Sequence, residues 1–387
     1  MDHVRLGIIG LGAEGGMYAE FLKEGKVDRM TLGAICDIDP AKKELAAEKY
    51  PDVPFFDHYI DMLDSGTVDA AVTTVPHYLH PEMGINILER GLHALVEKPA
   101  GVYTRQVKEL NTKAEAIPEQ TFAIFFNQRM NPLYQKVKAW IEAGSIGELL
   151  RTNWIITTWW RPQGYYDQSA WRATWGGEGG GVLVNQAPHQ LDLLQWLCGV
   201  PKSVFAKCNY GFQRDIVVED DVQFLMDYGN GATGFFQTCT HDINGTDRLE
   251  IVGTAGKIIV ENSKVATLYK LKQPEHEYSD NMNMDDVRKI FMGGGAGEMW
   301  TTEVYDEVEP HGQQHIKVLE NFTANVLDGT PLVAPGSDGI NGVRLANAVH
   351  LSSWLGREVP LDFDEDLYLT ELNKRIEAEG KYPVRES

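Results

Sequence analysis

The sequence predicts an α/β protein in which a parallel sheet covered by helices comes first and a strand-rich second domain follows. Three observations predict this class. Short apolar runs alternate with helical patterns over the first 126 residues. Later segments have the pattern of strands joined by Gly and Asn turns. The chain of 387 residues is long enough for two domains.

The first part of the chain contains five apolar runs of strand length, separated by helical patterns. Strands are expected at 4–10, 31–36, 68–75, 93–97 and 121–126, and helices at 17–25, 40–50, 80–91 and 104–116. Pro40 suits a first helical position, Thr104 an N-cap and Gly91 a C-cap. Strands that alternate with helices indicate a parallel sheet buried on both faces.

The strand pattern of the second part lies in the segments 203–212, 222–240 and 248–261. Within "DVQFLMDY" the alternation of apolar and polar residues is only partial, because Leu225 stands on the otherwise polar face. This apolar residue predicts that the second face of the sheet is also covered.

Charge and composition exclude several classes of partner. The formal net charge of −21 argues against nucleic acid and anionic membranes. The four cysteines form no C-x-x-C pair, so a reducing compartment is expected. The opening residues "MDHVRLGIIG" show no leader pattern, and no apolar run approaches the ~18 residues of a membrane span. We therefore expect a cytoplasmic protein.

A glycine fingerprint follows the first strand directly. Gly10, Gly12 and Gly15 form G-x-G-x-x-G in "GLGAEGG" and lead into a helical stretch, which is typical of a Rossmann dinucleotide-binding unit. Asp37 ends the second strand, where a carboxylate accepts hydrogen bonds from ribose hydroxyls and repels a 2′-phosphate. NAD is therefore favoured over NADP, although Asp39 competes with Asp37 for this role.

The ends of two later strands carry further polar residues. The fourth expected strand ends in "TTVPHYLH" and the next in "EKP", which places Glu97 and Lys98 at the ligand-binding edge of the sheet. A lysine beside the nicotinamide position is a candidate proton handler or carbonyl polariser. The alternative is an exposed loop lysine paired with Glu97.

The segment "EGGGVLVNQAPHQLDLLQWL" places polar residues on a buried-looking helix. Pro188 fits only a first helical turn, so the helix is expected to begin at 186–188, with Asn185 at or just before its cap. His189 and Asp192 then share one face. His189 is a candidate for proton transfer, and the alternative is a histidine that is hydrogen-bonded inside a domain interface.

The ordered motifs resemble the Gfo/Idh/MocA family of NAD(P)-dependent sugar and polyol oxidoreductases. They are "GLGAEGG", "CDIDP", "PHYLH", "EKP", "FFNQRMNP", "AGSIGEL", "WR", "GGGVLVNQAPHQLD", "RLEIVGTAGK" and "NGVRLANAVHLSSWLGREVPL". The resemblance implies a Rossmann domain at 1–127 and a substrate-binding and oligomerisation domain at 128–387 with a large open, mostly antiparallel sheet. It also implies that the region 338–365 can pack back on the first domain.

The resemblance also implies roles for individual residues. Lys98, His189 and Asn185 are the expected catalytic residues, although Asn185 departs from the Asp of the usual Asp-x-x-x-His and leaves the division of labour between Lys98 and His189 open. Residues expected at the cofactor are Gly10, Gly12, Ala13, Glu14, Gly15, Asp37, Thr74, Pro76, His80, Glu97, Lys98, Asn127, Trp171 and Arg172. Residues expected at the substrate are Lys98, Arg129, Trp160, Arg161, Tyr165, Asn185 and His189.

An aromatic segment at 153–175 holds five of the nine tryptophans and favours a sugar or glycoside ligand, since flat rings suit the C–H faces of pyranoses. A subunit interface is the alternative. His311 and His315 have metal-ligand spacing, but no third ligand is visible, so no metal is expected.

The expected reaction is hydride transfer between a sugar or glycoside carbinol carbon and nicotinamide C4. The alternatives are a glycosidase that uses NAD for transient oxidation and a non-catalytic sensor of sugar and NAD. By resemblance, the chain is expected to form a homodimer or homotetramer.

Overall fold

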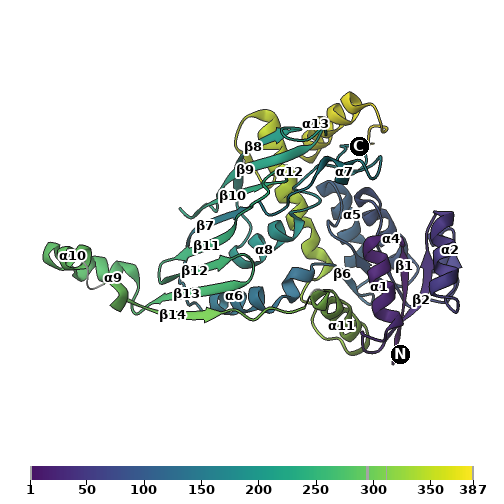
Figure 1. Cartoon of the computed structure of the whole chain (residues 1–387), viewed down its shortest axis with the longest axis horizontal. Coiled ribbons are helices and arrows are strands. Elements are labelled where there is room, and N and C mark those ends of the chain that lie inside the picture. The colour runs from purple at the N-terminus through teal and green to yellow at the C-terminus, as the bar shows by residue number, and fades with distance from the viewer. Residues whose placement is uncertain (1, 293–295, 311, 386–387) are drawn as a thin grey trace.

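The computed structural model describes residues 2–292, 296–310 and 312–385, and it contains two sheets joined through a layer of helices (Figure 1). The first sheet has six strands in the order β3-β2-β1-β4-β5-β6, and all of its pairings are parallel. Its strands are β1 (Val4–Ile9), β2 (Met30–Cys36), β3 (Phe55–Phe56), β4 (Ala70–Thr73), β5 (His93–Val96) and β6 (Phe122–Ile124).

The helices of this half follow the predicted alternation. They are α1 (Ala13–Lys23), α2 (Pro40–Lys49), α3 (Tyr59–Asp64), α4 (His80–Glu89) and α5 (Thr104–Glu115), with short turns η1 (His77–Leu79) and η2 (Asn127–Met130). Pro40 begins α2 as predicted, and Gly91 has φ +73° just after α4. The N-cap of α5 is Tyr103 and not Thr104, because Gln106 Oε1 accepts the Tyr103 N–H at 3.2 Å.

The second sheet has nine strands in the order β14-β13-β12-β11-β7-β10-β9-β8-β15, and only the β7–β10 pair is parallel. The mostly antiparallel sheet confirms the predicted fold class. Its strands are β7 (Leu149–Ile156), β8 (Ser203–Tyr210), β9 (Glu219–Asp227), β10 (Thr233–Cys239), β11 (Asp247–Gly253), β12 (Gly256–Glu261), β13 (Val265–Leu271), β14 (Trp300–Tyr305) and β15 (Val359–Pro360).

The remaining helices lie between the sheets or at the ends of the molecule (Figure 1). They are α6 (Pro132–Glu142), α7 (Gln163–Tyr166), α8 (Pro188–Cys198), α9 (Glu275–Asn281), α10 (Met284–Phe291), α11 (Gln313–Asp328), α12 (Gly339–Leu355) and α13 (Glu365–Glu379), with the turns η3 (Ala296–Glu298) and η4 (Gly336–Asp338). None of the helices in the described ranges is both long and apolar enough to cross a membrane.

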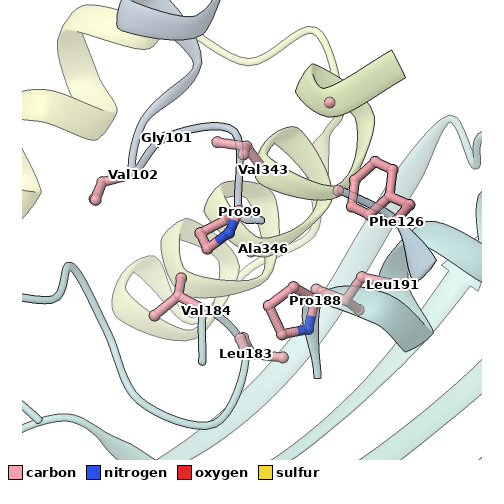
Figure 2. A pocket seen from close by; sticks show the side chains of 12 residues that line it. Pro99, Gly101, Val102, Phe126, Leu183, Val184, Pro188, Leu191, Val343 and Ala346 are labelled. Atoms are coloured by element: carbon pink, nitrogen blue, oxygen red, sulfur yellow. The ribbon is translucent and has the colours of Figure 1, made fainter. Parts of the chain in front are cut away.

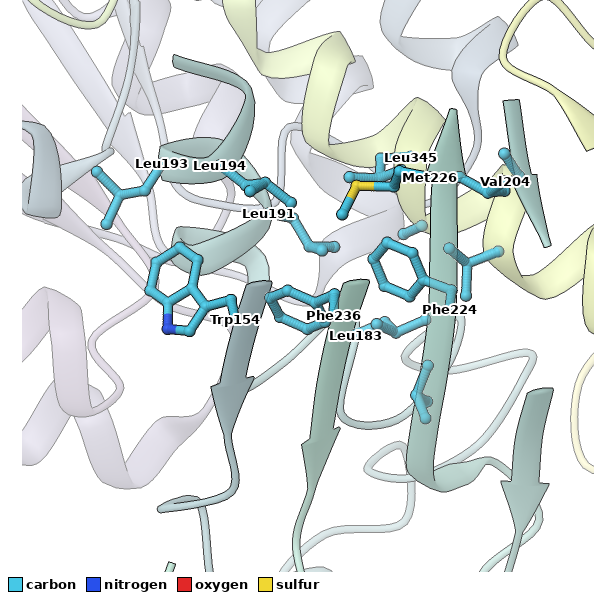
Figure 3. Close-up of a cluster of buried hydrophobic side chains, with 14 of the residues drawn as sticks. Trp154, Leu183, Leu191, Leu193, Leu194, Val204, Phe224, Met226, Phe236 and Leu345 are labelled. Carbon is cyan, nitrogen blue, oxygen red and sulfur yellow. The ribbon is translucent and has the colours of Figure 1, made fainter. Parts of the chain in front are cut away.

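The core of the second half lies between the sheet and α8 (Figure 3). The Phe224 and Phe236 rings stack at 5.1 Å, and Trp154 meets Phe236 edge-on at 6.0 Å. Leu191 and Leu194 of α8 are 1% and 0% exposed in this cluster, and each side chain of this size contributes about 1.5–3 kcal/mol. The opposite face of α8 is thereby free to carry polar groups toward the first sheet.

The other face of the second sheet is not covered by the described chain, so the prediction from Leu225 was wrong for the single chain. Leu225 is 55% exposed and Phe205 50% exposed, and every second residue of β8 and β9 is exposed around them. An antiparallel sheet tolerates this arrangement because one of its faces can remain in solvent.

Two late helices return toward the first sheet. Phe322 of α11 is buried with the side chains of β1, whereas Ile340 and Val343 at the start of α12 are buried with Val96 and Phe126. The later residues of α12 join the core of the second half. The predicted boundary between residues 127 and 128 stays a prediction, since the chain crosses between the two halves more than once.

Candidate active site

The glycine loop between β1 and α1 has the shape that a pyrophosphate requires. Gly10 has φ +97°, and a Cβ there would lie 2.4 Å from the Thr74 carbonyl oxygen. A Cβ on Gly15 would lie 2.0 Å from the Gly10 carbonyl oxygen, whereas a Cβ on Gly12 would meet open space. No side chain caps α1 at Gly12, so its first N–H groups are available to an anion. The loop therefore fits a dinucleotide.

Asp37 and Asp39, which compete for the ribose on sequence grounds, have different surroundings. Asp39 caps α2 by accepting the Ala41 N–H at 2.9 Å. Asp37 lies against the glycine loop and accepts the Leu11 N–H at 2.7 Å. A carboxylate oxygen has two acceptor sites, so Asp37 can still accept from a ribose hydroxyl. Ile38 beside it is 86% exposed.

A pocket of about 90 Å³ lies beyond the carboxyl end of β5. Lys98, from the end of β5, and His189, from the first turn of α8, both line it. The Lys98 Nζ donates to the Asn185 carbonyl oxygen at 3.4 Å. The complete lining is Glu14, Tyr18, Glu97, Lys98, Phe125, Asn127, His189 and His315. The structure thus brings a cation and an imidazole from distant parts of the chain to one cavity.

Behind Lys98 the pocket contains a buried carboxyl. Glu97 accepts a hydrogen bond from the Tyr18 hydroxyl and, at 3.0 Å, from the Lys98 backbone N–H. Burial raises the pKa of Glu97 to about 7, although the positive charge of Lys98 and the Tyr18 bond oppose the shift. Burial and the nearby Glu97 and Glu14 raise the pKa of Tyr18, which therefore remains a donor.

His189 occupies the second position of α8, whose N-cap is Ala187. Burial lowers the pKa of His189 well below its ordinary range, and the positive charges of Lys98 and His315 act in the same direction. The imidazole is therefore neutral near pH 7. Within the described residues its Nδ1 has no hydrogen-bond partner. The ring lines the pocket, and a neutral imidazole there is suited to accept a proton from a ligand.

Asn185 lies two residues before the N-cap of α8 and does not cap it. Of the two predicted positions, at the cap or just before it, only the second is therefore met. Its side-chain amide instead donates to Glu178, and the Tyr165 hydroxyl lies 3.5 Å from its Oδ1. Arg172 donates to the Tyr165 hydroxyl at 2.7 Å and lies 3.6 Å from Glu178. Glu178 was missed by sequence analysis, because a Glu before three glycines carries no distinctive signal.

Arg129 was predicted to contact substrate, and the structure places it elsewhere. Its guanidinium is 3% exposed and bonds both oxygens of Asp192, at 2.7 and 2.9 Å. Arg129 also bonds Asp338 at 2.6 Å and the Val333 carbonyl oxygen at 3.1 Å. These contacts join η2, α8 and the η4 turn, and they give Arg129 a structural role.

Of the remaining residues predicted at the cofactor, some line the pocket and others support the structure around it. Asn127 lines the pocket and its Nδ2 lies 3.0 Å from His315 Nε2. Thr74 hydrogen-bonds the Ile9 carbonyl oxygen at 2.9 Å and so braces the glycine loop. Ala13 and Glu14 begin α1, and Pro76 precedes η1. His80 is buried, with its ring nitrogens 2.7 and 2.8 Å from the Pro99 and Val75 carbonyl oxygens.

The aromatic segment contributes unevenly. The Trp171 ring meets His77 edge-on at 6.0 Å, and Arg172 lies 4.9 Å from the centre of that ring. Arg161 and Arg172 lie 5.1 and 4.6 Å from the centre of the Tyr165 ring. Trp160 is 40% exposed and lies outside the pocket lining. The structure therefore groups Tyr165, Arg161 and Arg172 apart from Trp160, and none of these three residues lines the pocket either.

A small apolar cavity of about 10 Å³ lies beside this site (Figure 2). Pro99, Val102, Pro188 and Val343 line it, so it marks the packing of the loop after β5 against α8 and α12. At this size it holds at most one water. His315 lines the larger pocket and His311 lies outside the described residues, which contain no cluster of three metal-ligating side chains.

Comparison with known proteins agrees with this geometry. Residues 4–124 match the model of an oxidoreductase family with an NAD-binding Rossmann fold, and residues 134–259 match the Gfo/Idh/MocA C-terminal domain. The chain is 23% identical over 368 residues to a myo-inositol 2-dehydrogenase of Thermotoga maritima, covering 93% of this chain and 99% of the relative.

Two solved structures share the whole architecture. The WlbA dehydrogenase of Bordetella pertussis, in complex with NADH and UDP-GlcNAcA, superposes with a TM-score of 0.75 and 25% identity over 94% of this chain and 99% of its own. A levoglucosan dehydrogenase superposes with a TM-score of 0.76 at 19% identity, covering 93% of this chain and 100% of its own, and supports the fold alone. The chain is therefore an NAD-binding oxidoreductase that belongs to the Gfo/Idh/MocA family.

Proposed function

We propose that the protein is an NAD-dependent dehydrogenase that oxidises a ring hydroxyl of a sugar, polyol or glycoside. The observation that carries the proposal is the shared pocket of Lys98 and His189 beyond the carboxyl end of β5. Ligands of parallel α/β sheets bind at this edge. When bound, NAD accepts the hydride at nicotinamide C4, and the protein supplies orientation and electrostatics.

We assign His189 as the base that takes the substrate hydroxyl proton. Its imidazole is neutral and has an unpartnered nitrogen, as the chemistry requires. Lys98 offers its ammonium to the same oxygen and stabilises the developing alkoxide. Proton transfer to His189 places a second positive charge close to Lys98. The negative charge of the substrate oxygen offsets this repulsion, which is strongest in the empty pocket.

Cofactor preference follows from Asp37. Its carboxylate is fixed at the end of β2 by the Leu11 and Asp39 N–H groups and faces the glycine loop. A 2′-phosphate placed there would meet a like charge, whereas ribose hydroxyls would donate to it. We therefore propose NAD as the working cofactor.

The substrate class is supported by the rim of the pocket and by the relatives. Tyr165, Arg172 and Asn185 form a hydrogen-bonded polar group beside Lys98, which suits a ligand with several hydroxyls. By name, the Thermotoga relative acts on myo-inositol, and the WlbA dehydrogenase binds a nucleotide sugar. The uncovered sheet face around Phe205 and Leu225 supports assembly into a homodimer or homotetramer.

The test is a panel of inositols, pyranosides and a nucleotide sugar, each with NAD or NADP, followed at the nicotinamide absorbance. Net NADH formation with at least one of them supports the proposal. Glycoside cleavage without net NADH formation would instead indicate transient oxidation. Binding of NAD with no chemistry on any member of the panel would contradict a dehydrogenase.

A further inference from the structure

The Glu178 carboxyl lies beneath the predicted substrate rim and is surrounded by donors. It is 1% exposed. One oxygen accepts the Ala173 N–H at 2.6 Å, and the other accepts the side-chain amide of Asn185 and lies 3.6 Å from Arg172. The two carboxyl oxygens therefore accept from the Ala173 and Asn185 donors and face the Arg172 cation.

The surrounding backbone indicates that the Glu178 carboxyl stabilises the conformation of the segment around it. Ala173 has φ +52°, a left-handed conformation that costs a non-glycine residue free energy. Its N–H is directed at Glu178. The Glu178 carbonyl oxygen also lies 3.1 Å from His77 Nδ1, so residue 178 links the rim to the first sheet as well.

These contacts decide which way the Asn185 amide points. Because its NH₂ group faces Glu178, its carbonyl oxygen Oδ1 faces the Tyr165 hydroxyl. Asn185 also contributes the backbone oxygen that lies 3.4 Å from the Lys98 ammonium, so the backbone of this residue borders the pocket. A reversed amide would present donors there instead.

We propose that Glu178 is a positioning residue that holds the NH₂ group of Asn185 and keeps Oδ1 on the side of the Tyr165 hydroxyl, where Oδ1 can accept a hydrogen bond from a substrate hydroxyl. This assignment rests on the proposed dehydrogenase function. It makes Asn185 an acceptor without adding a negative charge beside Lys98 and Arg172.

The decisive change is Glu178→Gln, which keeps the size of the side chain. The backbone fixes the Ala173 N–H, which continues to donate to the oxygen of the new amide at position 178. The NH₂ group of that amide then faces Asn185. The Asn185 amide therefore rotates and presents its own oxygen to this NH₂ group. We expect kcat/KM for the polyol to fall about tenfold or more, with NADH affinity unchanged. Asn185→Asp alone places two carboxyls in contact and is expected to lose a similar factor.

The double variant Glu178→Gln/Asn185→Asp separates positioning from general damage. The new amide at position 178 then donates to the new carboxylate at position 185, which again presents an oxygen to the substrate, so the double variant should recover most of the loss. Glu219 is the matched control, because it is 0% exposed and holds the same glycine segment through the Gly181 N–H at 2.8 Å. Glu219→Gln combined with Asn185→Asp supplies no amide donor to the new carboxylate at position 185, so it should not restore activity.

The same proteins are compared by their urea midpoints, which require no substrate. The double variant at 178 and 185 should be more stable than either single variant, whereas the pair at 219 and 185 should be less stable than either. If the wild type oxidises no member of the panel, the proposed function fails, and the urea midpoints still decide the amide orientation. The proposal is overturned if Glu178→Gln/Asn185→Asp recovers neither activity nor midpoint.

Discussion

The Lys98 ammonium lies 3.4 Å from the backbone oxygen of Asn185, although 87 positions separate the two residues in the sequence. Lys98 follows shortly after the last residue of β5, and Asn185 belongs to the glycine-rich segment that leads into α8. The contact joins the end of β5 to the second half of the chain beside the pocket. A ligand that bonds the ammonium must therefore compete with Asn185 for it, as the proposed role of Lys98 at the reacting oxygen requires.

Replacing Lys98 by Met removes the cation while keeping much of its length. We expect kcat/KM to fall about 10²–10⁴-fold, since the group acts on the proton or charge of the reacting oxygen. NADH should bind within a few-fold of the wild-type affinity, because the glycine loop and Asp37 are untouched. Steady-state rates and titration of tryptophan fluorescence with NADH measure the two quantities. Turnover close to the wild-type rate would exclude Lys98 from the chemistry.

Much of the fold follows from local pattern, whereas several site residues do not. The five longer strands of the first sheet and the glycine loop were predictable because apolar runs, Pro40 and the glycines have local meaning. Strand β3 has two residues and gives no periodic signal. Leu225 misled because one apolar residue on a polar face cannot show whether a partner covers it.

The site departs from the sequence prediction where long-range contacts decide. Arg129 was expected at the substrate by resemblance to the family, yet Asp192 and Asp338 from later segments bind its guanidinium. The importance of Glu178 comes from the Ala173 and Asn185 donors that converge on its carboxyl. The Arg129 partners lie 63 and 209 positions away and leave no local signature. The Glu178 contacts span only five and seven positions, but they lie in an irregular segment that has no periodic pattern.

Breaking the Arg129–Asp192 pair tests the structural role given to Arg129. Arg129→Met leaves Asp192, which is 2% exposed, without its cation and should lower the free energy of unfolding by about 3–5 kcal/mol. The double variant Arg129→Met/Asp192→Leu should recover part of that loss, because no buried charge remains. Urea denaturation measures both. A raised KM with unchanged stability would restore the original assignment of Arg129 to the substrate.

The buried carboxyl of Glu97 makes stability depend on pH. Its pKa in the folded protein is raised to about 7 from an ordinary 4.5. At pH values between these two pKa values, the folded state therefore binds more protons than the unfolded chain. Its contribution is therefore complete below about pH 4.5 and is lost as pH rises through about 7. Glu97→Gln cannot lose a proton, so its stability relative to wild type should rise by up to about 3 kcal/mol across this window.

Urea unfolding at several pH values between 4.5 and 8 measures this difference. Glu89→Gln is the control, because the exposed Glu89 carboxyl has a pKa lowered by Lys113 and its replacement should not gain stability as pH rises. A difference between Glu97→Gln and wild type that stays constant with pH would mean that Glu97 is ionised throughout and that the Tyr18 bond is made to a carboxylate.

The contrast between Asp37 and Asp39 gives a test of cofactor choice with an internal control. Asp37→Ser removes the charge that faces the ribose, so the NADP/NAD ratio of kcat/KM should rise by about tenfold or more. Asp39→Ala removes the N-cap of α2, should cost about 1 kcal/mol of stability and should leave that ratio unchanged. Rates with both cofactors at low ionic strength measure the ratio, because salt screens exposed charges. If Asp39→Ala shifts the ratio and Asp37→Ser does not, the ribose lies nearer to α2 than the fixed position of Asp37 against the Leu11 N–H implies.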